Sequence, residues 1–368
     1  MRVLVTADTV GGVWTYAREL VAGLIRHGVQ VTLISFGEIP TPRQSAWMEG
    51  LQGLDYRPTA FHLEWMQEAQ RDVEQSMRFL ESVIREVRPD LLHFNQFCYG
   101  NVGADLPRIV VAHSDVVSWW LSVHGEEPPP SPWLRWYQQV VRRGLRSATT
   151  VVAPSRWMLN MLTEIYGRPM DSMVVYNGRS SRLFNPHMTK TEAVLGVGRL
   201  WDCAKQVSLL TRYPQAVPVW IAGSEIHPEE TLRGESGLVA EANVELKGPL
   251  PEKQVRMLYT RAAIYAATSR YEPFGLAPLE AAMSRCALVA NDIPSFHELW
   301  GDTAIYFRHN DGPDLAEKIR QLAADPALRR TYALRAYRRA LQRFTAERMV
   351  NEYLQLYCSL VGAEALAA

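Results

Sequence analysis

The first 36 residues, MRVLVTADTVGGVWTYARELVAGLIRHGVQVTLISF, contain a complete strand, helix and strand. An apolar strand is expected over 2–7, followed by a turn at Gly11-Gly12. Apolar residues then recur at helical spacing up to Gly28, which closes the helix, and 29–36 supplies a second strand. This is the unit from which parallel sheets are built. The N-terminal part therefore predicts a Rossmann-like α/β domain.

The same alternation continues and then restarts after an irregular connection at 179–190. Strands are expected first over 91–95, 109–113 and 149–153, and then over 193–197, 217–222, 244–247, 263–267, 287–290 and 303–307. Amphipathic helices close the chain. We predict an α/β protein with two Rossmann-like, doubly wound domains, 1–180 and 181–345, facing a central cleft. Segment 346–368 is expected to be a helix that packs back toward the first domain.

Length, charge and cysteine content narrow the class of protein. A chain of 368 residues suits two domains, and 39 basic residues balance 39 acidic ones, so no nucleic-acid partner is expected. The apolar run at the start is too short for a signal peptide, and no stretch reaches the length of a membrane span. We expect a cytoplasmic protein. Cys98, Cys203, Cys286 and Cys358 form no C-x-x-C pair, which favours reduced thiols over a zinc site or disulfides.

The most informative local motif is EPFGLAPLE, residues 272–280, which follows an apolar strand and continues into a helical pattern. The loop should end at a helix N-terminus, where free N–H groups and the helix dipole suit a phosphate. Gly275 would let the backbone approach a ligand closely. Glu272 and Glu280 could accept hydrogen bonds from paired sugar hydroxyls. Alternatively, Glu280 only complements the helix dipole and Glu272 is solvated.

Cations and a histidine follow other strands. Arg199 comes at the end of the first strand of the second domain, and Lys205 lies six residues later. Fixed cations there would stabilise the charge of a leaving diphosphate, although they could also be ordinary surface residues. In the first domain, Gly11-Gly12 and His113 belong at the carboxyl ends of strands, where open α/β sheets bind ligands. His113 could equally be structural.

Two absences are informative. No G-x-G-x-x-G motif occurs at either βα turn, which disfavours a dinucleotide cofactor. No D-x-D pair occurs anywhere, so the usual carboxylate clamp for a metal on a diphosphate is missing. We expect neither a cofactor nor a metal.

As a set and in order, the motifs resemble the retaining family 4 glycosyltransferases, a group that includes sucrose synthase and many sugar transferases of lipopolysaccharide and glycolipid synthesis. The resemblance covers nearly the whole chain and includes the E-x7-E motif from Glu272 to Glu280. The other matching stretches are Gly11-Gly12, Pro89-Asp90-Leu91-Leu92-His93, Val111-Ala112-His113, Ala153-Pro154-Ser155, Asn177-Gly178, Val197-Gly198-Arg199-Leu200, Ala222-Gly223, Gly248 and Leu258-Tyr259.

The resemblance implies a GT-B fold and a role for each matching residue. Arg199 and Lys205 would hold the donor diphosphate, and Glu280 would bind the ribose hydroxyls. The remaining donor-binding residues would be Gly11, Gly12, Glu272, Phe274, Gly275 and Leu276. The residues expected to take part in catalysis are His113, Glu272, Arg199 and Lys205. One departure concerns the Arg199-to-Lys205 spacing, which is one residue longer than the commonest spacing in the family and puts the position of Lys205 in question.

The implied reaction is the retaining transfer of a hexose from a nucleoside diphosphate donor, with a UDP-sugar favoured over a GDP- or ADP-sugar. The acceptor is a glycan, a lipid-linked molecule or a small molecule that the sequence does not identify, and a role in cell-surface glycan or glycolipid synthesis is expected. Two alternatives remain open. One is a nucleotide-sugar epimerase of GT-B architecture, and the other is a catalytically silent binding subunit.

An aromatic-rich segment over 119–137 precedes Arg142, Arg143 and Arg146. These side chains could stack on an acceptor sugar or rest on the inner face of a membrane beside anionic lipids. Alternatively, they only pack within the first domain.

Overall fold

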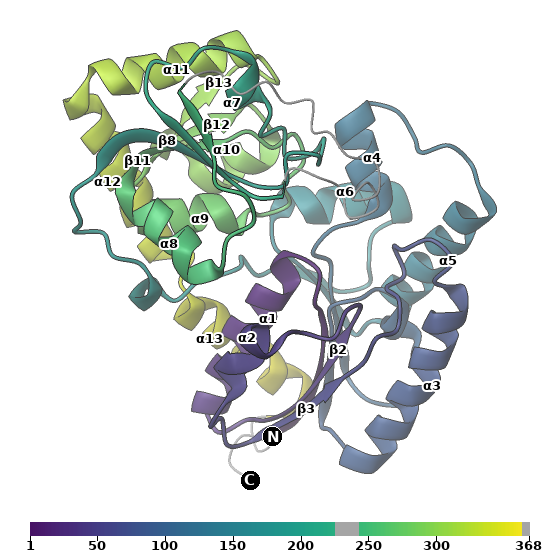
Figure 1. Cartoon of the computed structure of the whole chain (residues 1–368). Helices are drawn as coiled ribbons and strands as arrows, with labels where there is room; N and C mark the ends of the chain where they lie inside the picture. The colour runs from purple at the N-terminus through teal and green to yellow at the C-terminus, as the bar shows by residue number, and fades with distance from the viewer. Residues whose placement is uncertain (225–242, 363–368) are drawn as a thin grey trace. The chain divides into compact units, whose positions relative to one another are not determined.

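The computed structural model describes residues 1–224 and 243–362. The chain divides into two compact units, the first comprising Met1–Trp120, Glu126–Gly178 and the chain from Ala346 onward. The second comprises Leu121–Gly125 and Arg179–Thr345. Each unit is an α/β structure (Figure 1). The last six residues of the predicted terminal segment 346–368 lie outside the described residues.

The first unit is built on a parallel sheet with strand order β3-β2-β1-β4-β5-β6-β7 among the described residues. The strands are β1 (Arg2–Asp8), β2 (Gln30–Phe36), β3 (Leu54–Pro58), β4 (Leu91–Phe94), β5 (Arg108–Val111), β6 (Thr150–Ala153) and β7 (Ser172–Val174). β1 pairs with β2 from Arg2 opposite Gln30 to Asp8 opposite Phe36. The predicted parallel α/β sheet is confirmed, and β3 and β7 are two strands that the sequence reading missed.

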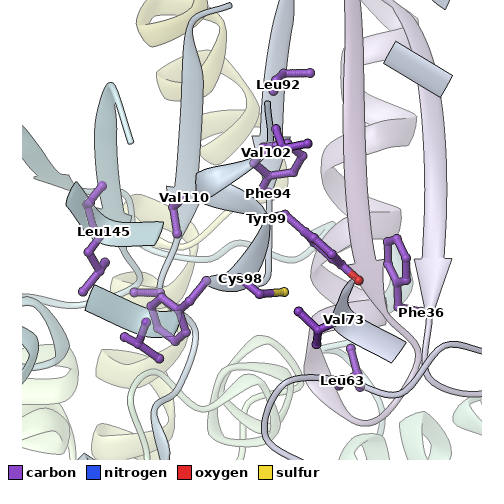
Figure 2. Close-up of a cluster of buried hydrophobic side chains, with 14 of the residues drawn as sticks. Phe36, Leu63, Val73, Leu92, Phe94, Cys98, Tyr99, Val102, Val110 and Leu145 are labelled. Atoms are coloured by element: carbon purple, nitrogen blue, oxygen red, sulfur yellow. The ribbon is translucent and has the colours of Figure 1, made fainter. Parts of the chain in front are cut away.

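The central strands β1, β2, β4, β5 and β6 are buried on both faces, which explains why they are largely apolar. Successive residues of β1 alternate between two clusters, with Leu4 in one and Val3 and Val5 in the other. Figure 2 shows the first cluster, which joins residues of the central strands to Val73 and Leu145 from the covering helices. The helices are α1 (Gly12–Arg26), α2 (Pro42–Ser45), η1 (Ala46–Met48), α3 (Gln70–Val87), η2 (Cys98–Asn101), α4 (Val116–His124, of which Leu121–His124 is assigned to the second unit), α5 (Pro132–Ser147), α6 (Arg156–Tyr166) and α13 (Ala346–Val361).

The C-terminal helix α13 belongs to the first unit, where it packs against α1. Gly23 of α1 leaves the space that the side chain of Val350 occupies. At the other end, the Tyr357 hydroxyl lies 2.7 Å from His93 Nδ1, and the Tyr16 hydroxyl lies 3.2 Å from His93 Nε2. Burial lowers the pKa of His93 to about 3, so the ring is neutral and can donate one of these hydrogen bonds and accept the other.

The second unit repeats the architecture with sheet order β10-β9-β8-β11-β12-β13 among the described residues, all in parallel pairs. The strands are β8 (Thr191–Val197), β9 (Val219–Ala222), β10 (Val244–Leu246), β11 (Ala262–Ala267), β12 (Ala287–Asn291) and β13 (Ile305–Phe307). Each falls within a few residues of a predicted strand. The helices are η3 (Ser181–Leu183), α7 (Leu209–Arg212), α8 (Glu252–Arg261), α9 (Leu276–Met283), α10 (Pro294–Trp300), η5 (Gly301–Thr303), α11 (Gly312–Ala324) and α12 (Pro326–Arg343).

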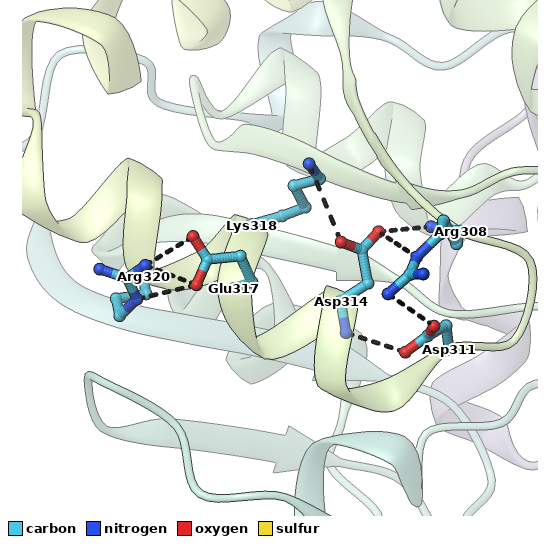
Figure 3. A network of polar contacts seen from close by, with 6 residues as sticks. All are labelled: Arg308, Asp311, Asp314, Glu317, Lys318 and Arg320. Carbon is cyan, nitrogen blue, oxygen red and sulfur yellow. Dashed lines mark hydrogen bonds and ion pairs between the residues drawn. The ribbon is translucent and has the colours of Figure 1, made fainter.

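A polar network sets the turn between β13 and α11 (Figure 3). Asp311 caps the helix by accepting a hydrogen bond from the backbone N–H of Asp314 at 3.0 Å, and it also pairs with Arg308 at 3.0 Å. Arg308 N in turn donates to the Asp314 carboxylate at 2.7 Å. The Arg308 side chain is exposed, so its ion pair contributes little, whereas the cap contributes about 1 kcal/mol.

Over residues 1–224 and 243–362, no helix combines the length and the apolar character needed to cross a membrane.

Candidate functional site

As predicted, the 272–280 motif runs from the end of the loop after β11 into the first turns of α9. Gly275 is the N-cap of α9 and has a φ of 87°, a left-handed conformation that side chains with a Cβ rarely adopt. A Cβ at this position would also lie 3.0 Å from Cγ of Glu272. The first backbone N–H groups of α9 therefore follow a residue without a side chain, an arrangement suited to an anion.

Lys205, from the segment between β8 and α7, forms an ion pair with Glu272 of this loop. Lys205 Nζ lies 2.6 Å from Glu272 Oε2, and the Ser269 hydroxyl donates to the same oxygen at 3.1 Å. The Glu272 side chain is mostly buried, whereas about a third of the Lys205 side chain is exposed, at 31%. Two residues that the sequence predicts at one site thus meet, and part of the Lys205 side chain remains exposed.

The segment carrying Lys205 is tied to the segment after β11. The Thr268 hydroxyl donates to the Lys205 carbonyl at 2.7 Å, and Arg270 N donates to the Ala204 carbonyl at 2.9 Å. Backbone contacts of this kind fix the position of a loop independently of its surface side chains. The extra residue between Arg199 and Lys205 therefore does not prevent Lys205 from reaching the β11–α9 loop.

Arg199 has different partners. Its guanidinium lies 2.7 Å from Asp202 Oδ2 and 4.6 Å from the ring centroid of Trp201. The Arg199 side chain is about half exposed and the Asp202 side chain is mostly buried. Sequence reasoning missed Asp202, although a carboxylate three residues from an arginine was a usable signal for a local ion pair.

Glu280 lies on α9 and pairs with a buried arginine. Arg179 Nε lies 2.8 Å from Glu280 Oε1, and Arg179 Nη2 lies 2.8 Å from Glu252 Oε1 on α8. The Arg179 side chain is fully buried. Sequence reasoning missed this residue. The residues around an arginine that follows an Asn-Gly turn do not indicate whether its side chain is buried or which residues it contacts.

In the first unit, Gly11 and Gly12 lie where β1 leads into α1. Gly11 is the N-cap of α1 with a φ of 90°, and Gly12 is the first helical residue. A Cβ on Gly11 would meet no atom within 4 Å, so glycine is required there by the backbone conformation rather than by crowding. The turn between β1 and α1 is short and consists of Thr9, Val10 and Gly11.

His113 follows β5 and is oriented by Asn95, a residue that the sequence reading did not single out. His113 Nε2 lies 2.7 Å from Asn95 Oδ1, while Asn95 Nδ2 donates to the Thr6 carbonyl at 2.6 Å. Because the Thr6 carbonyl can only accept, the Asn95 oxygen must face His113 and Nε2 must carry the proton. Burial lowers the pKa of His113 to about 3, so the ring is neutral with an unprotonated Nδ1.

Asp8, also missed from the sequence, ends β1 beside the glycine turn and is largely buried. Its Oδ1 accepts a hydrogen bond from Val10 N at 2.5 Å. Burial, helped by the nearby charge of Glu64, raises the pKa of Asp8 to about 7. This carboxyl group therefore titrates near neutrality at the carboxyl edge of the first sheet.

The aromatic segment packs into the first unit. The Trp133 indole donates to the Met66 carbonyl at 2.9 Å, and the Tyr137 hydroxyl donates to Asp115 at 2.9 Å. Trp133 and Trp136 also pack against the buried cluster of Figure 2. These contacts agree with the packing interpretation of the segment.

The four cysteines are all free thiols. Within residues 1–224 and 243–362, no group of three or more His, Cys, Asp or Glu side chains is arranged to hold a metal ion.

Two sequence families match the two halves of the chain. Residues 10–181 match Glycosyltransferase Family 4, and residues 192–325 match Glycosyl transferases group 1. The lipopolysaccharide core biosynthesis mannosyltransferase LpcC of Rhizobium leguminosarum bv. viciae is 38% identical over 117 residues, which are 31% of this chain and only 33% of LpcC. Alpha-maltose-1-phosphate synthase of Mycolicibacterium smegmatis is 25% identical over 300 residues, 72% of this chain and 75% of the synthase.

Solved structures agree over almost the full length. Sucrose-phosphate synthase (tll1590) from Thermosynechococcus elongatus superposes with a TM-score of 0.77 at 19% identity, covering 99% of this chain and 100% of the other. HepE of Anabaena, solved with UDP-glucose, has a TM-score of 0.72 at 19% identity, covering 98% and 100%. At this identity the likeness shows the fold. The family matches and the two parallel-sheet units together place the chain in glycosyltransferase family 4, with the GT-B fold.

Proposed function

We propose that the chain is a retaining hexosyltransferase that uses a nucleoside diphosphate sugar, with a UDP-sugar favoured over a GDP- or ADP-sugar. The observation that carries the proposal is the Lys205–Glu272 ion pair beside the N-terminus of α9, whose helix also bears Glu280. A cation, free helical N–H groups and two carboxylates are the groups that a sugar nucleotide needs, since it presents a diphosphate and two sets of hydroxyls.

Each group has a distinct task in this proposal. Lys205 and Arg199 bind the diphosphate and stabilise the charge that develops as it leaves. The backbone of Phe274, Gly275 and Leu276 contacts the phosphates, Glu272 contacts the donor sugar, and Glu280 accepts hydrogen bonds from the ribose hydroxyls. Because an ammonium group has three donors, Lys205 can hold Glu272 and a phosphate oxygen together.

His113 and the Gly11-Gly12 turn are the first-unit groups that we propose to meet the donor. The Asn95 contact holds the His113 ring in one neutral tautomer. A ring of this kind can form hydrogen bonds with sugar hydroxyls, and its charge stays the same throughout the neutral pH range.

The comparisons support the donor class and suggest a context. HepE was solved with UDP-glucose, and LpcC is a mannosyltransferase of lipopolysaccharide core synthesis. We therefore propose a sugar or lipid-linked glycan as the acceptor, in synthesis of a cell-surface glycan or glycolipid. Peripheral contact with the inner face of a membrane is part of this proposal, because Arg142, Arg143 and Arg146 are exposed on α5.

The proposal is tested by incubating the protein with UDP-, GDP- and ADP-sugars, with and without EDTA. We expect slow release of nucleoside diphosphate from a UDP-sugar, faster with an acceptor, and no loss of rate with EDTA, because Lys205 and the α9 N–H groups neutralise the phosphates. Nuclear magnetic resonance of the product should show the anomeric configuration of the donor. Activity lost on chelation and restored by Mg²⁺ would contradict the metal-independent mechanism.

The same experiment distinguishes the alternatives. An epimerase would change the configuration of the sugar without transferring it to an acceptor. A silent binding subunit would bind UDP but would not cleave the UDP-sugar. Either result would overturn the transferase proposal.

Glu280→Ala is expected to weaken UDP binding by about 1 to 3 kcal/mol, as the loss of a charged hydrogen bond typically does. Isothermal titration calorimetry would measure the dissociation constant directly. Glu317→Ala is a matched control, because Glu317 lies on α11 in the exposed network of Figure 3 and should leave UDP affinity unchanged. Equal affinity of the wild type and Glu280→Ala would show that Glu280 does not bind the ribose.

A further inference from the structure

Arg179 is a fully buried cation that contacts two carboxylates. Its Nε lies 2.8 Å from Glu280 Oε1 and its Nη2 lies 2.8 Å from Glu252 Oε1. Its guanidinium carbon also lies 5.7 Å from the centroid of the Phe184 ring. The guanidinium is a rigid, planar fork, so ion pairs at two of its nitrogens and a neighbouring aromatic ring restrict its orientation.

The backbone of Arg179 also makes specific contacts. Arg179 N donates to the Phe344 carbonyl at 3.1 Å, and Arg179 forms an isolated parallel bridge with Thr345. The Phe344 ring in turn packs edge-on against Phe274 of the loop before α9, with centroids 5.4 Å apart. The segments at 179 and 344 therefore contact the 272–280 motif at two separate points, Phe274 and Glu280.

Charge balance alone does not account for the contact with Glu280. The Glu252 carboxylate already supplies a counter-charge for Arg179, and its side chain remains substantially exposed, at 40%. Glu280 is much less exposed, at 13%, so its carboxylate depends more on a defined partner for its orientation. An ionised carboxylate can accept about four hydrogen bonds, so contact with Arg179 is compatible with accepting two ribose hydroxyls.

From this geometry we infer that Arg179 is a positioning residue for nucleotide recognition. It holds the Glu280 carboxylate in the orientation that receives the ribose hydroxyls, and it makes no contact with the donor itself. The inference rests on the proposed role of Glu280 and adds to it a residue outside the 272–280 motif.

A double-mutant cycle with UDP tests the inference, with GDP and ADP titrated in parallel. Arg179→Met is expected to weaken UDP binding by about tenfold in the wild-type background and by less than about twofold in Glu280→Gln, because its effect passes through that carboxylate. A purely structural arginine would cost the same affinity in both backgrounds, and that result would overturn the inference. With 2′,3′-dideoxy-UDP, the effect of Arg179→Met should also shrink to less than about twofold.

Arg329→Met is the matched control. Arg329 is another poorly exposed arginine of the second unit, paired with Glu192 at 2.7 Å, and its loss should lower thermal stability without changing UDP affinity. If Arg179→Met does not fold, Arg179→Lys takes its place in the cycle, because a lysine keeps the charge but not the fork. The same dependence on Glu280 is expected, and additive losses would again overturn the inference.

The cycle separates this inference from the proposed function. Unchanged UDP affinity in Glu280→Gln alone would refute the ribose role of Glu280 and the inference with it. Weakened affinity in Glu280→Gln with additive losses in the cycle would refute only the positioning role of Arg179.

Discussion

Replacing Lys205 with alanine is expected to lower kcat/KM for the donor sugar by about 100- to 1000-fold, the usual cost of removing one fixed group that stabilises transition-state charge. Lys205 Nζ is the cation that lies against Glu272, at 2.6 Å. Its removal would take away one of the two proposed counter-charges for the leaving diphosphate and would leave the mostly buried Glu272 carboxylate to repel the phosphates. Initial rates of donor turnover would measure the loss.

Two further variants separate these contributions. Lys205→Ala combined with Glu272→Gln removes the repulsion, so it should bind UDP more tightly than Lys205→Ala alone while its turnover remains low. Lys318→Ala is the control for loss of a lysine, since Lys318 lies on α11 near Asp314, 3.9 Å away, and should retain full activity. Wild-type turnover by Lys205→Ala would refute the proposed role of Lys205 in catalysis.

Gly223→Ala is expected to destabilise the second unit by about 3 kcal/mol, near the upper end of the range for overpacked sites. A Cβ on Gly223 would lie 1.9 Å from the Gly198 carbonyl oxygen, and Gly223 has a φ of 154°. The clash involves backbone atoms that are held in place, because Gly198 N donates a hydrogen bond to the Ala222 carbonyl at 3.0 Å. A loss of this size should lower the unfolding midpoint by about 6 to 12 °C.

Thermal unfolding followed by circular dichroism would measure the change, with Gly103→Ala as the control. A Cβ on Gly103 would approach only the carboxylate end of Glu81, at 2.8 Å, and a flexible side chain can move away. Because Gly198 precedes Arg199, Gly223→Ala should also weaken UDP binding. An unfolding midpoint equal to that of Gly103→Ala would contradict this prediction. It would show that the backbone at Gly198 and Gly223, just after β8 and β9, can move apart without loss of stability.

Much of the fold could be predicted because its central strands are buried on both faces. Apolar runs such as those at 2–7 and 263–267 indicate strands of a parallel sheet without knowledge of their neighbours. The strands that escaped prediction are at the edges of the first sheet, where β3 and β7 are only partly buried. Partial burial relaxes the need for apolar residues, so the pattern that reveals a central strand is weak at an edge.

At the candidate site, the features that could be predicted are those that depend on residues close together in the sequence. The sequence by itself determined that a glycine loop leads into a helix at 275, because turn and helix signals are local. It also placed Arg199, Lys205, Glu272 and His113 after strands, at the carboxyl ends where such sheets bind ligands.

Only the tertiary structure decided which side chains meet. In the structure, Lys205 pairs with Glu272, Arg199 with Asp202, His113 with Asn95, and the buried Arg179 with Glu280. Except for the pair of Arg199 with Asp202, these partners lie far apart along the chain. Their contacts depend on strand order and on side-chain orientation, neither of which leaves a periodic signal in the sequence.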